Sequence, residues 1–462
     1  MEHSAVPSLL RPLSTDEYSP PARTSLQRQA TALVADLGAD SARRSGVELV
    51  AYAASRRGTA AGLLSLNQAA GATYFEVPPD AAVDEAAAED LFAADGPVID
   101  VQTHWMAQRP SLHAAQDRLL RLYRWFAPDW WDGLDGVVAY SLAEYLRCVF
   151  VESETAVAVI TAAPGNAEGD MMLRNDEMAG MRELFDRMAG TGRLLNHTVV
   201  RPNQGEIEHM AAWAEAYDPI GWKVYTLGRM DEEHESFIPG SGWRLDDDTG
   251  LAFLGEAQRL GISLVCAHKG VSGLVDCSAP DDVGPAARAF PDIDFLIYHS
   301  GYEPGRLEGP YAEDGPTLGI DTLIRSVTDH GLGPGDNVYA ELGTTWFNLL
   351  SRPEEAGHAL GKLLLQLGED NIIWGTDGIW YGPTQPAIDA FRAFQIPDHL
   401  CERYGYPKLT PSARRKILCD NATRVYGLDP GTLGAGASDD LAWVDAVLAE
   451  HGRHGLVHRS GD

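Results

Sequence analysis

The sequence has few cysteines, no long apolar run and a shortage of positive charge. Its 462 residues include five cysteines, scattered along the chain without close pairs or zinc-finger spacing. Such a sparse, odd set excludes a disulfide framework and indicates buried free thiols in a reducing compartment. No run of about 18 apolar residues occurs, so the sequence predicts no membrane span.

Positive charge is scarce, because Lys and Arg number 36 against 67 Asp and Glu, and the net charge is −31. Nucleic acids and anionic membrane surfaces attract clusters of Lys and Arg. The composition therefore predicts neither as a partner and leaves a small molecule as the expected ligand. The apolar fraction of 45% is ordinary for a globular protein with a sizeable core.

One stretch is similar to an export signal. Arg56 and Arg57 precede a weakly apolar run at 58–72, in the manner of a twin-arginine signal. The Phe-Leu pair that usually follows is missing, and the stretch begins only at Ser55. We prefer an amphipathic helix in an N-terminal extension. We therefore expect a cytoplasmic protein, with export as the alternative.

Three segments of the chain differ in pattern. Residues 1–95 are rich in Ala, Arg, Asp and Ser with apolar residues at helical spacing, which predicts a helical N-terminal extension. Residues 96–428 alternate short apolar runs with helical stretches. Residues 429–462 hold a Gly-rich linker and then an amphipathic helical pattern, which would pack on the same chain or on a partner.

The middle segment contains eight short apolar runs, most of them separated by a helical stretch. Runs without polar alternation indicate strands buried on both faces. Eight such strands alternating with helices are typical of an α/β protein of the (β/α)8 TIM-barrel class. The predicted strands are 98–104, 155–164, 193–203, 221–228, 261–270, 292–301, 337–346 and 371–378.

Two long aromatic-rich connections follow the first and the eighth predicted strands, at 105–150 and 379–411. In this fold the connections after the strands form the active-site face. These segments would therefore cover a pocket, or alternatively pack against neighbouring helices.

Polar side chains gather where the predicted strands end. Gln102 and His104 are separated by one residue on a strand, so their side chains project to the same face. The corresponding polar residues of later strands are Lys223, His268, Lys269, His299, Glu341 and Asp377. The carboxyl ends of the strands meet at one mouth of a barrel, so we expect these side chains to converge.

Histidines and an aspartate at one barrel mouth suit a divalent metal, with zinc as the first choice and manganese or iron as alternatives. Each residue alone has an ordinary explanation: a core histidine, Lys223 paired with Glu341, or Asp377 as a helix cap. The coincidence of four such residues, His104, His268, His299 and Asp377, at four matching strand ends favours a site.

Several motifs, in this order and spacing, resemble the amidohydrolase superfamily over about residues 96–428. They are DVQTH, GWKVYT, CAHKG, FLIYHSGYE, WGTDG and KILCDNATRVYGL. Within the superfamily the chain resembles amidohydrolase-related family 2, the branch that includes aminocarboxymuconate semialdehyde decarboxylase. The resemblance implies a metal-dependent barrel at 96–428, and it leaves 1–95 and 429–462 outside.

The resemblance also implies roles for single residues. His104, His268 and Asp377 would bind one metal, and His299 would act as the acid/base, with Asp377 as a second proton acceptor. Gln102 departs from the common His-x-His or Glu-x-His pattern, so it would be a weak ligand or an orienting hydrogen-bond donor.

The reaction stays open at this point, because hydrolases, decarboxylases and hydratases all occur in the branch. Trp105 and the aromatic insertion favour a planar or apolar substrate, and Lys223, Lys269 and Arg109 could receive a carboxylate. We expect a metal-dependent hydrolase of a small cyclic or carboxylated compound.

Two alternatives to the hydrolase remain. The first is a nonoxidative decarboxylase of an aromatic or enol acid, and the second is a non-catalytic binding or assembly protein on a degenerate barrel. Barrels of the branch are often dimers, which implies a homodimer.

Overall fold

The structure is a computed structural model of the chain. It describes residues 5–11, 22–93, 96–107, 140–163, 165, 171–189, 192–231, 236–270, 275–304, 306–313, 315, 319–433 and 442–454.

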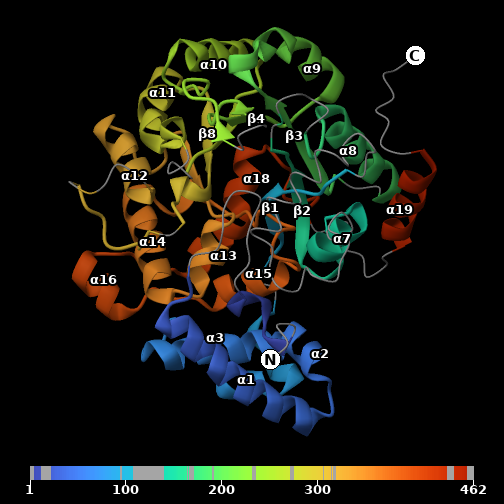
Figure 1. Cartoon of the computed structure of the whole chain (residues 1–462), viewed down its shortest axis with the longest axis vertical. Helices are drawn as coiled ribbons and strands as arrows, with labels where there is room; N and C mark the ends of the chain where they lie inside the picture. The colour runs from blue at the N-terminus through green and yellow to red at the C-terminus, as the bar shows by residue number, and fades with distance from the viewer. Residues whose placement is uncertain are drawn as a thin grey trace.

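Eight parallel strands form the central sheet, in the order β1-β2-β3-β4-β7-β8-β9-β10 (Figure 1). The ring closes between its first and last members, where Thr103 bridges Gly378 and the Val101 N–H bonds the Trp374 carbonyl at 3.2 Å. This nearly closed barrel confirms the predicted (β/α)8 fold. The strands are β1 (Val98–Thr103), β2 (Thr155–Ile160), β3 (Leu194–Val200), β4 (Gly221–Tyr225), β7 (Leu264–His268), β8 (Asp294–Tyr298), β9 (Val338–Glu341) and β10 (Ile372–Ile373).

The last strand is shorter than predicted. Only Ile372 and Ile373 pair with β9, although the predicted strand extends to Gly378. The chain then leaves regular strand geometry, and Asp377 has a φ of 59°. Its N–H bonds the Gln102 carbonyl at 2.9 Å, so this segment is fastened to β1 by single bonds instead of a ladder.

Helices surround the barrel, as Figure 1 shows. Local sequence explains their limits: in α10, for example, the Asp247 side chain accepts the Gly250 N–H as a cap, and Gly261 ends the helix in the left-handed conformation. The helices are α7 (Leu142–Leu146), α8 (Asn175–Ala189), α9 (Met210–Tyr217), α10 (Asp248–Leu260), α11 (Val283–Ala289), α12 (Ile320–Asp329), α13 (Thr345–Leu350), α14 (Pro353–Gln366), α15 (Gln385–Ala393), α16 (Asp398–Tyr404), α17 (Pro411–Arg415) and α18 (Asn421–Val425).

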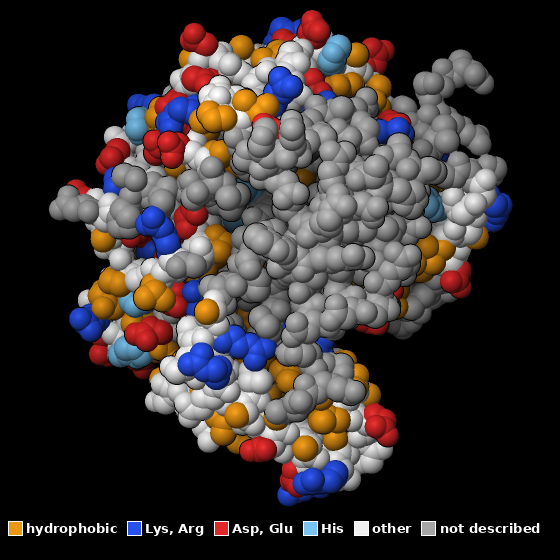
Figure 2. Space-filling model, in the orientation of Figure 1, with side chains coloured by type: hydrophobic (Ala, Val, Ile, Leu, Met, Phe, Trp, Pro, Cys, Tyr) orange, Lys and Arg blue, Asp and Glu red, His pale blue; other side chains and the backbone are white. Residues whose placement is uncertain are grey.

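Among the described residues before the barrel, four α-helices form a group that projects from its rounded body (Figures 1 and 2). Thr24 and Gln27 form a reciprocal capping box at the start of the first. The Phe75 and Phe394 rings, 5.4 Å apart, join this group to the barrel. The helices are α1 (Ser25–Ser45), α2 (Leu49–Ala54), α3 (Arg56–Ala70) and α4 (Glu85–Leu91). The extension is thus helical where it is described, while the boundaries at 95 and 428 stay predictions.

The arginine pair of the signal-like stretch lies at the start of α3. The Arg56 side chain pairs with Glu154, with Glu89 at 2.5 Å and with Asp389 at 3.5 Å. The Arg57 guanidinium lies 5.9 Å from the centre of the Tyr52 ring. Within the described ranges, no helix has both the length and the apolar character needed to cross a bilayer.

The end of the chain supplies two more features. The predicted closing helix at 412–428 is α17 and α18 joined by a π-helical turn at Lys416–Asp420. The amphipathic tail forms α19 (Ala442–His454), which packs on the same chain against α7 and α8. Outside the barrel, β5 (Met230–Asp231) and β6 (Ser236–Phe237) form a short antiparallel pair.

Candidate active site

The seam between β1 and β10 brings the first predicted site residues together. The His104 N–H bonds the Gly378 carbonyl at 2.5 Å, and the Asp377 N–H bonds the Gln102 carbonyl at 2.9 Å. The alternation of side chains along β1 then turns both Gln102 and His104 toward Asp377. All three side chains are buried.

The Asp377 carboxylate is held from three directions. Its Oδ1 lies 3.0 Å from His104 Nε2 and accepts the Gln102 amide at 2.9 Å, and its Oδ2 accepts the Thr344 hydroxyl at 2.5 Å. Burial acts to raise the pKa of Asp377, but the His104 contact and the nearby charge of His299 outweigh it, and the net shift is downward. The side chain is therefore an anion.

The His104 ring has a fixed orientation. Its Nδ1 lies 2.8 Å from the Thr161 carbonyl, and a carbonyl oxygen only accepts, so Nδ1 carries a hydrogen. In the neutral ring, Nε2 then turns its lone pair toward the Asp377 carboxylate. Two lone pairs facing each other at 3.0 Å require a cation, either a proton or a metal ion.

Gln102 acts as a donor in this arrangement. Its amide nitrogen bonds Asp377 and also lies 3.5 Å from His299 Nε2, so the two hydrogens of one NH2 group reach both neighbours. Its Oε1 has no hydrogen-bond partner in the part of the chain that the structure describes. An amide nitrogen does not bind metal ions, and it is the nitrogen that faces Asp377 here. Whether Gln102 is a weak ligand through Oε1 or an orienting hydrogen-bond donor stays a prediction.

His299 follows β8 and presents one nitrogen to the mouth. Its Nδ1 donates to the Gly343 carbonyl at 2.9 Å, so Nε2 faces Gln102 as an acceptor in the neutral ring and carries the second hydrogen in the charged ring. Its backbone N–H bonds Glu341 at 2.9 Å. A ring held in this way can take up and release a proton at Nε2.

His268, at the end of β7, completes the group of imidazoles. Its ring is stacked on Tyr225, with centroids 4.5 Å apart, and meets the His299 ring edge-on at 4.8 Å. Burial, followed by the charge of Lys223, lowers the pKa of His268 well below its usual value. The ring is therefore neutral, which is the form that binds metal ions.

Buried ionisable side chains lie beside these rings. The Lys223 ammonium is 3.4 Å from the centre of the Tyr298 ring and 4.5 Å from that of Tyr225. Burial raises the pKa of Glu341 to about 8, although backbone N–H groups of His299 and Gly343 oppose the shift. Lys223 is fully buried, against aromatic faces.

Asp100, two residues before Gln102 on β1, is another of these buried ionisable side chains. Its carboxyl accepts the Thr376 N–H at 2.9 Å and the Thr376 hydroxyl at 2.5 Å. Burial raises its pKa to about 7. Gly375 is needed next to it, because a Cβ there would lie 1.9 Å from Glu341 Oε1.

Left-handed backbone angles recur after three neighbouring strands. His299, Thr344 and Asp377, which follow β8, β9 and β10, have φ of 61°, 58° and 59°. Thr344 is the least expected, because it is β-branched and its ψ is −47°. The Thr345 N–H bonds the Gly343 carbonyl around it, so Thr344 is the centre of a strained γ-turn.

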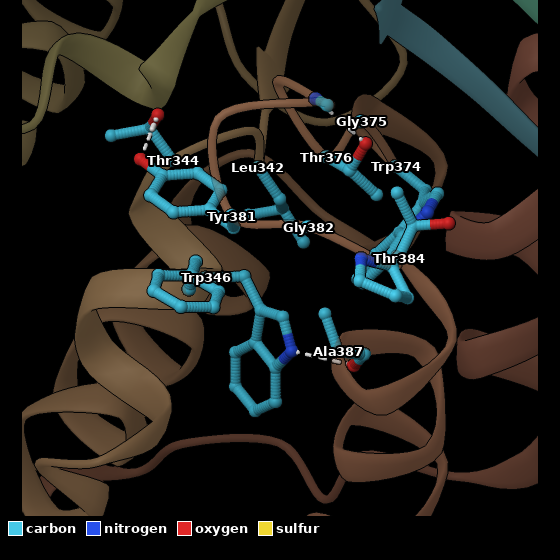
Figure 3. Close-up of a pocket in the computed structure, with 13 residues that line it drawn as sticks. Leu342, Thr344, Trp346, Trp374, Gly375, Thr376, Tyr381, Gly382, Thr384 and Ala387 are labelled. Atoms are coloured by element: carbon cyan, nitrogen blue, oxygen red, sulfur yellow. Dashed lines mark hydrogen bonds between the residues drawn. The ribbon is translucent and has the colours of Figure 1, made fainter. Parts of the chain in front are cut away.

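Thr344 and Tyr381 are the residues that sequence reasoning missed. The Tyr381 hydroxyl donates to Thr344 Oγ1 at 2.6 Å (Figure 3). Thr344 donates in turn to Asp377. A cavity of about 10 Å³, room for about one water molecule, adjoins both side chains. The signal in the sequence is the Gly-Thr-Thr at 343–345, hydroxyl groups directly after a buried strand.

The remaining predicted residues are distributed differently. Trp105 is buried beside His104, with 1% of its surface exposed. Lys269 does not face the mouth as a spare charge, because its ammonium forms a fully buried ion pair with Asp282 at 2.6 Å. Arg109 and most of the aromatic insertion, 108–139, lie outside the described residues.

The donor set fits a divalent cation in chemistry. His104 Nε2 and Asp377 Oδ1 face each other across a contact that needs positive charge, and imidazole nitrogen with carboxylate oxygen is a zinc or manganese donor set. Among the described residues, no three His, Cys, Asp or Glu side chains are arranged as they stand to hold one ion. His268 therefore stays a predicted third ligand.

Comparison with known sequences gives one family. The profile of a family described as amidohydrolase matches residues 99–428. No curated protein sequence matches the chain significantly.

Solved structures of similar chains are distant. A 2,6-dihydroxybenzoate decarboxylase from Rhizobium is 13% identical, covers 72% of this chain and 99% of its own, and has a TM-score of 0.41. A dihydroxybenzoic acid decarboxylase from Polaromonas, solved with manganese and 2-nitroresorcinol, is 13% identical, covers 72% and 97%, and has a TM-score of 0.39. "Amidohydrolase 2" from Bifidobacterium longum is 13% identical, covers 72% and 100%, and has a TM-score of 0.37. Similarity at this level carries no information about the reaction.

Proposed function

The chain belongs to the amidohydrolase family, since the match spans residues 99–428, and from that premise we propose that it is a metal-dependent hydrolase of a small cyclic or carboxylated compound. The ligands would be His104, Asp377 and His268, with zinc as the first candidate and manganese or iron as alternatives. His299 would be the acid/base, and Gln102 would orient it.

The observation that carries the proposal is the contact between His104 and Asp377. Because His104 Nδ1 is committed to the Thr161 carbonyl, its Nε2 can meet the carboxylate at 3.0 Å only with a cation between them, either a proton or a metal ion. The Asp377 carboxylate, whose pKa is lowered by the His104 contact, and the neutral His268 ring are both donors that a divalent cation accepts. When bound, a divalent cation acts as a Lewis acid that activates water or polarises a carbonyl.

The chain's own residues would supply the proton transfer. His299 Nε2 faces the mouth. Because Nδ1 keeps its hydrogen in the bond to the Gly343 carbonyl, Nε2 is the nitrogen that would gain and lose the proton. The Gln102 amide would keep the His299 ring and the Asp377 carboxylate in fixed relative positions. Decarboxylation uses the same groups, with His299 delivering a proton to carbon, and remains the alternative reaction.

Metal content tests the proposal first. We expect purified protein, measured by inductively coupled plasma mass spectrometry, to contain close to one equivalent of zinc, manganese or iron. His268→Ala should lose it. His358→Ala is the matched control, because His358 is also buried but bonds Tyr406 at 3.1 Å on α14, away from the mouth. Protein that takes up no metal under any loading condition would contradict an enzyme of this kind and favour a binding protein.

The reaction is then separated by products. Metal-loaded protein is incubated with lactones, cyclic amides and ring acids, among them 2,6-dihydroxybenzoate, and followed for ring opening and for CO2. Ring opening that His299→Gln abolishes supports the hydrolase. CO2 release without ring opening assigns the decarboxylase instead.

A further inference from the structure

Helix α19 is anchored to the barrel by an aromatic residue near its start. The Trp443 ring lies 5.7 Å from Phe150 and 5.4 Å from Phe185. The Arg193 guanidinium lies 5.1 Å from the centres of both Phe150 and Trp443. Arg193 also donates to the carbonyls of Thr155, at 3.1 Å, and Ala156, so the anchor reaches the start of β2.

The other end of α19 reaches the mouth. The His451 ring meets Trp105 edge-on, with centroids 5.9 Å apart and planes at 85°. Trp105 directly follows His104, and its indole N–H has no hydrogen-bond partner among the described residues. Among the described residues, the Trp105 indole is therefore oriented by packing against other side chains and not by a hydrogen bond of its N–H group.

The backbone around Trp105 is held by isolated bonds. The His104 N–H bonds Gly378 at 2.5 Å, the Met106 N–H bonds the Tyr140 carbonyl at 2.7 Å, and the Ala107 N–H bonds the Met172 carbonyl at 3.1 Å. These bonds lead to three different segments of the chain. A segment held in this way depends on side-chain packing for its position more than a strand in a ladder does.

We propose that α19 is a positioning element of the barrel mouth, in which His451 packs against Trp105 and so holds the backbone that carries the His104 ring. The proposal depends neither on a bound metal nor on the reaction. It gives the C-terminal segment, which lies outside the family match, a role in the site.

Hydrogen exchange of the full chain, read at the His104, Met106 and Ala107 amides, tests this. We expect His451→Ala to speed exchange there about two- to ten-fold, the factor that matches the loss of one aromatic contact, with no change in β7. His451→Phe keeps a ring and should restore slow exchange. Glu450→Ala is the matched control on the same helix, because Glu450 pairs only with Arg453 among the described residues, at 3.3 Å.

Three outcomes would overturn the proposal. Exchange at these amides could stay unchanged in His451→Ala and in a chain that lacks residues 442–462. His451→Phe could exchange as fast as His451→Ala, which would show that the ring contact is not the cause. Exchange could also rise equally in β7, which would show global destabilisation.

Discussion

At the residue scale, Thr344 holds a conformation that a β-branched side chain normally avoids. Angles in this region cost about 1–3 kcal/mol. In this conformation the Thr344 hydroxyl bonds both Asp377 and Tyr381. The strain is therefore retained where it orients the candidate metal-binding carboxylate.

Replacing Thr344 should separate function from stability. In Thr344→Gly the released strain offsets the loss of two buried hydrogen bonds, worth about 1–3 kcal/mol, so the free energy of unfolding should change by less than about 1 kcal/mol. Metal affinity, measured by chelator competition, should fall by about 10- to 100-fold. Thr344→Ser keeps the hydroxyl and should bind like the wild type.

Asp218→Gly is the control for strain alone. Asp218 caps the C-terminal end of α9 with a φ of 42°, and its side chain is exposed. Glycine there should stabilise the fold and leave metal affinity unchanged. Wild-type affinity in Thr344→Gly would contradict the role given to the hydroxyl.

Gln102 allows a second prediction at this scale. Gln102→Glu replaces the donor to Asp377 with a second carboxylate, so without metal the two anions repel and the melting temperature should fall. A divalent ion relieves the repulsion, so chelator competition should show tighter binding than in the wild type. A variant that is more stable without metal and binds metal no better would refute this reading of the site.

The residue scale also shows where sequence reasoning ends. Strand alternation predicts that Gln102 and His104 share one face, and the structure brings both to Asp377. The γ-turn at Thr344 leaves no mark in residue type, since its angles are those that threonine avoids. From the sequence, Lys269 could receive a carboxylate, because no short-range pattern joins it to its partner Asp282 in another segment.

At the element scale, a buried ion cluster joins the N-terminal helices to the barrel. Arg56 of α3 contacts Asp389 of α15 at 3.5 Å and also pairs with Glu154. Burial raises the pKa of Asp389 to about 7, against the charge of Arg56 and the Gln385 hydrogen bond. The carboxyl therefore ionises in the folded protein only near neutral pH.

Asp389 should make stability fall as pH rises. Its folded pKa of about 7 lies above the unfolded value of about 4, so between these pH values the folded state binds the extra proton, and stability declines with increasing pH. The decline, on the order of a few kcal/mol, is complete above pH 7. In Asp389→Asn the difference in unfolding free energy between pH 5 and pH 8, from urea titrations, should shrink accordingly. An identical pH dependence in both proteins would exclude this contribution.

Elements were predicted best where the pattern was strong and local. The eight predicted runs all became barrel strands, because burial on both faces favours mostly apolar residues without polar alternation. The eighth ended early, at Ile373, and the left-handed angle of Asp377 that follows is not indicated by the residue types around it. Whether α19 packed on this chain or on a partner could not be read from its own amphipathic pattern.

At the scale of the whole molecule, acidic charge dominates. The net charge of −31 leaves many Asp and Glu residues without a basic partner, although both signs are interspersed on the face in Figure 2. Self-repulsion of this kind destabilises the compact state. Salt shortens its range from about 30 Å at 0.01 M to about 10 Å at 0.1 M.

Added salt should therefore raise the melting temperature. We expect a steady increase between about 0.01 and 0.1 M NaCl, measured by calorimetry, because screening of repulsion outweighs the weakening of surface ion pairs. KCl at equal ionic strength should give the same shift if the effect is screening. A melting temperature that falls with salt would show that the ion pairs dominate. The homodimer, a proposal from the family resemblance, is checked by light scattering on the same samples.

The closure between β1 and the segment after β10 has a consequence for inactivation. Two ligand candidates lie on opposite sides of this closure, His104 after β1 and Asp377 after β10. Only isolated hydrogen bonds join the two sides. Separation of β1 from the segment after β10 would pull His104 and Asp377 apart, while the seven strand ladders of the barrel stay intact. Heating would then abolish metal binding and activity at a temperature below the melting temperature. A tightly bound ion would oppose this loss, because it would link β1 to the segment after β10.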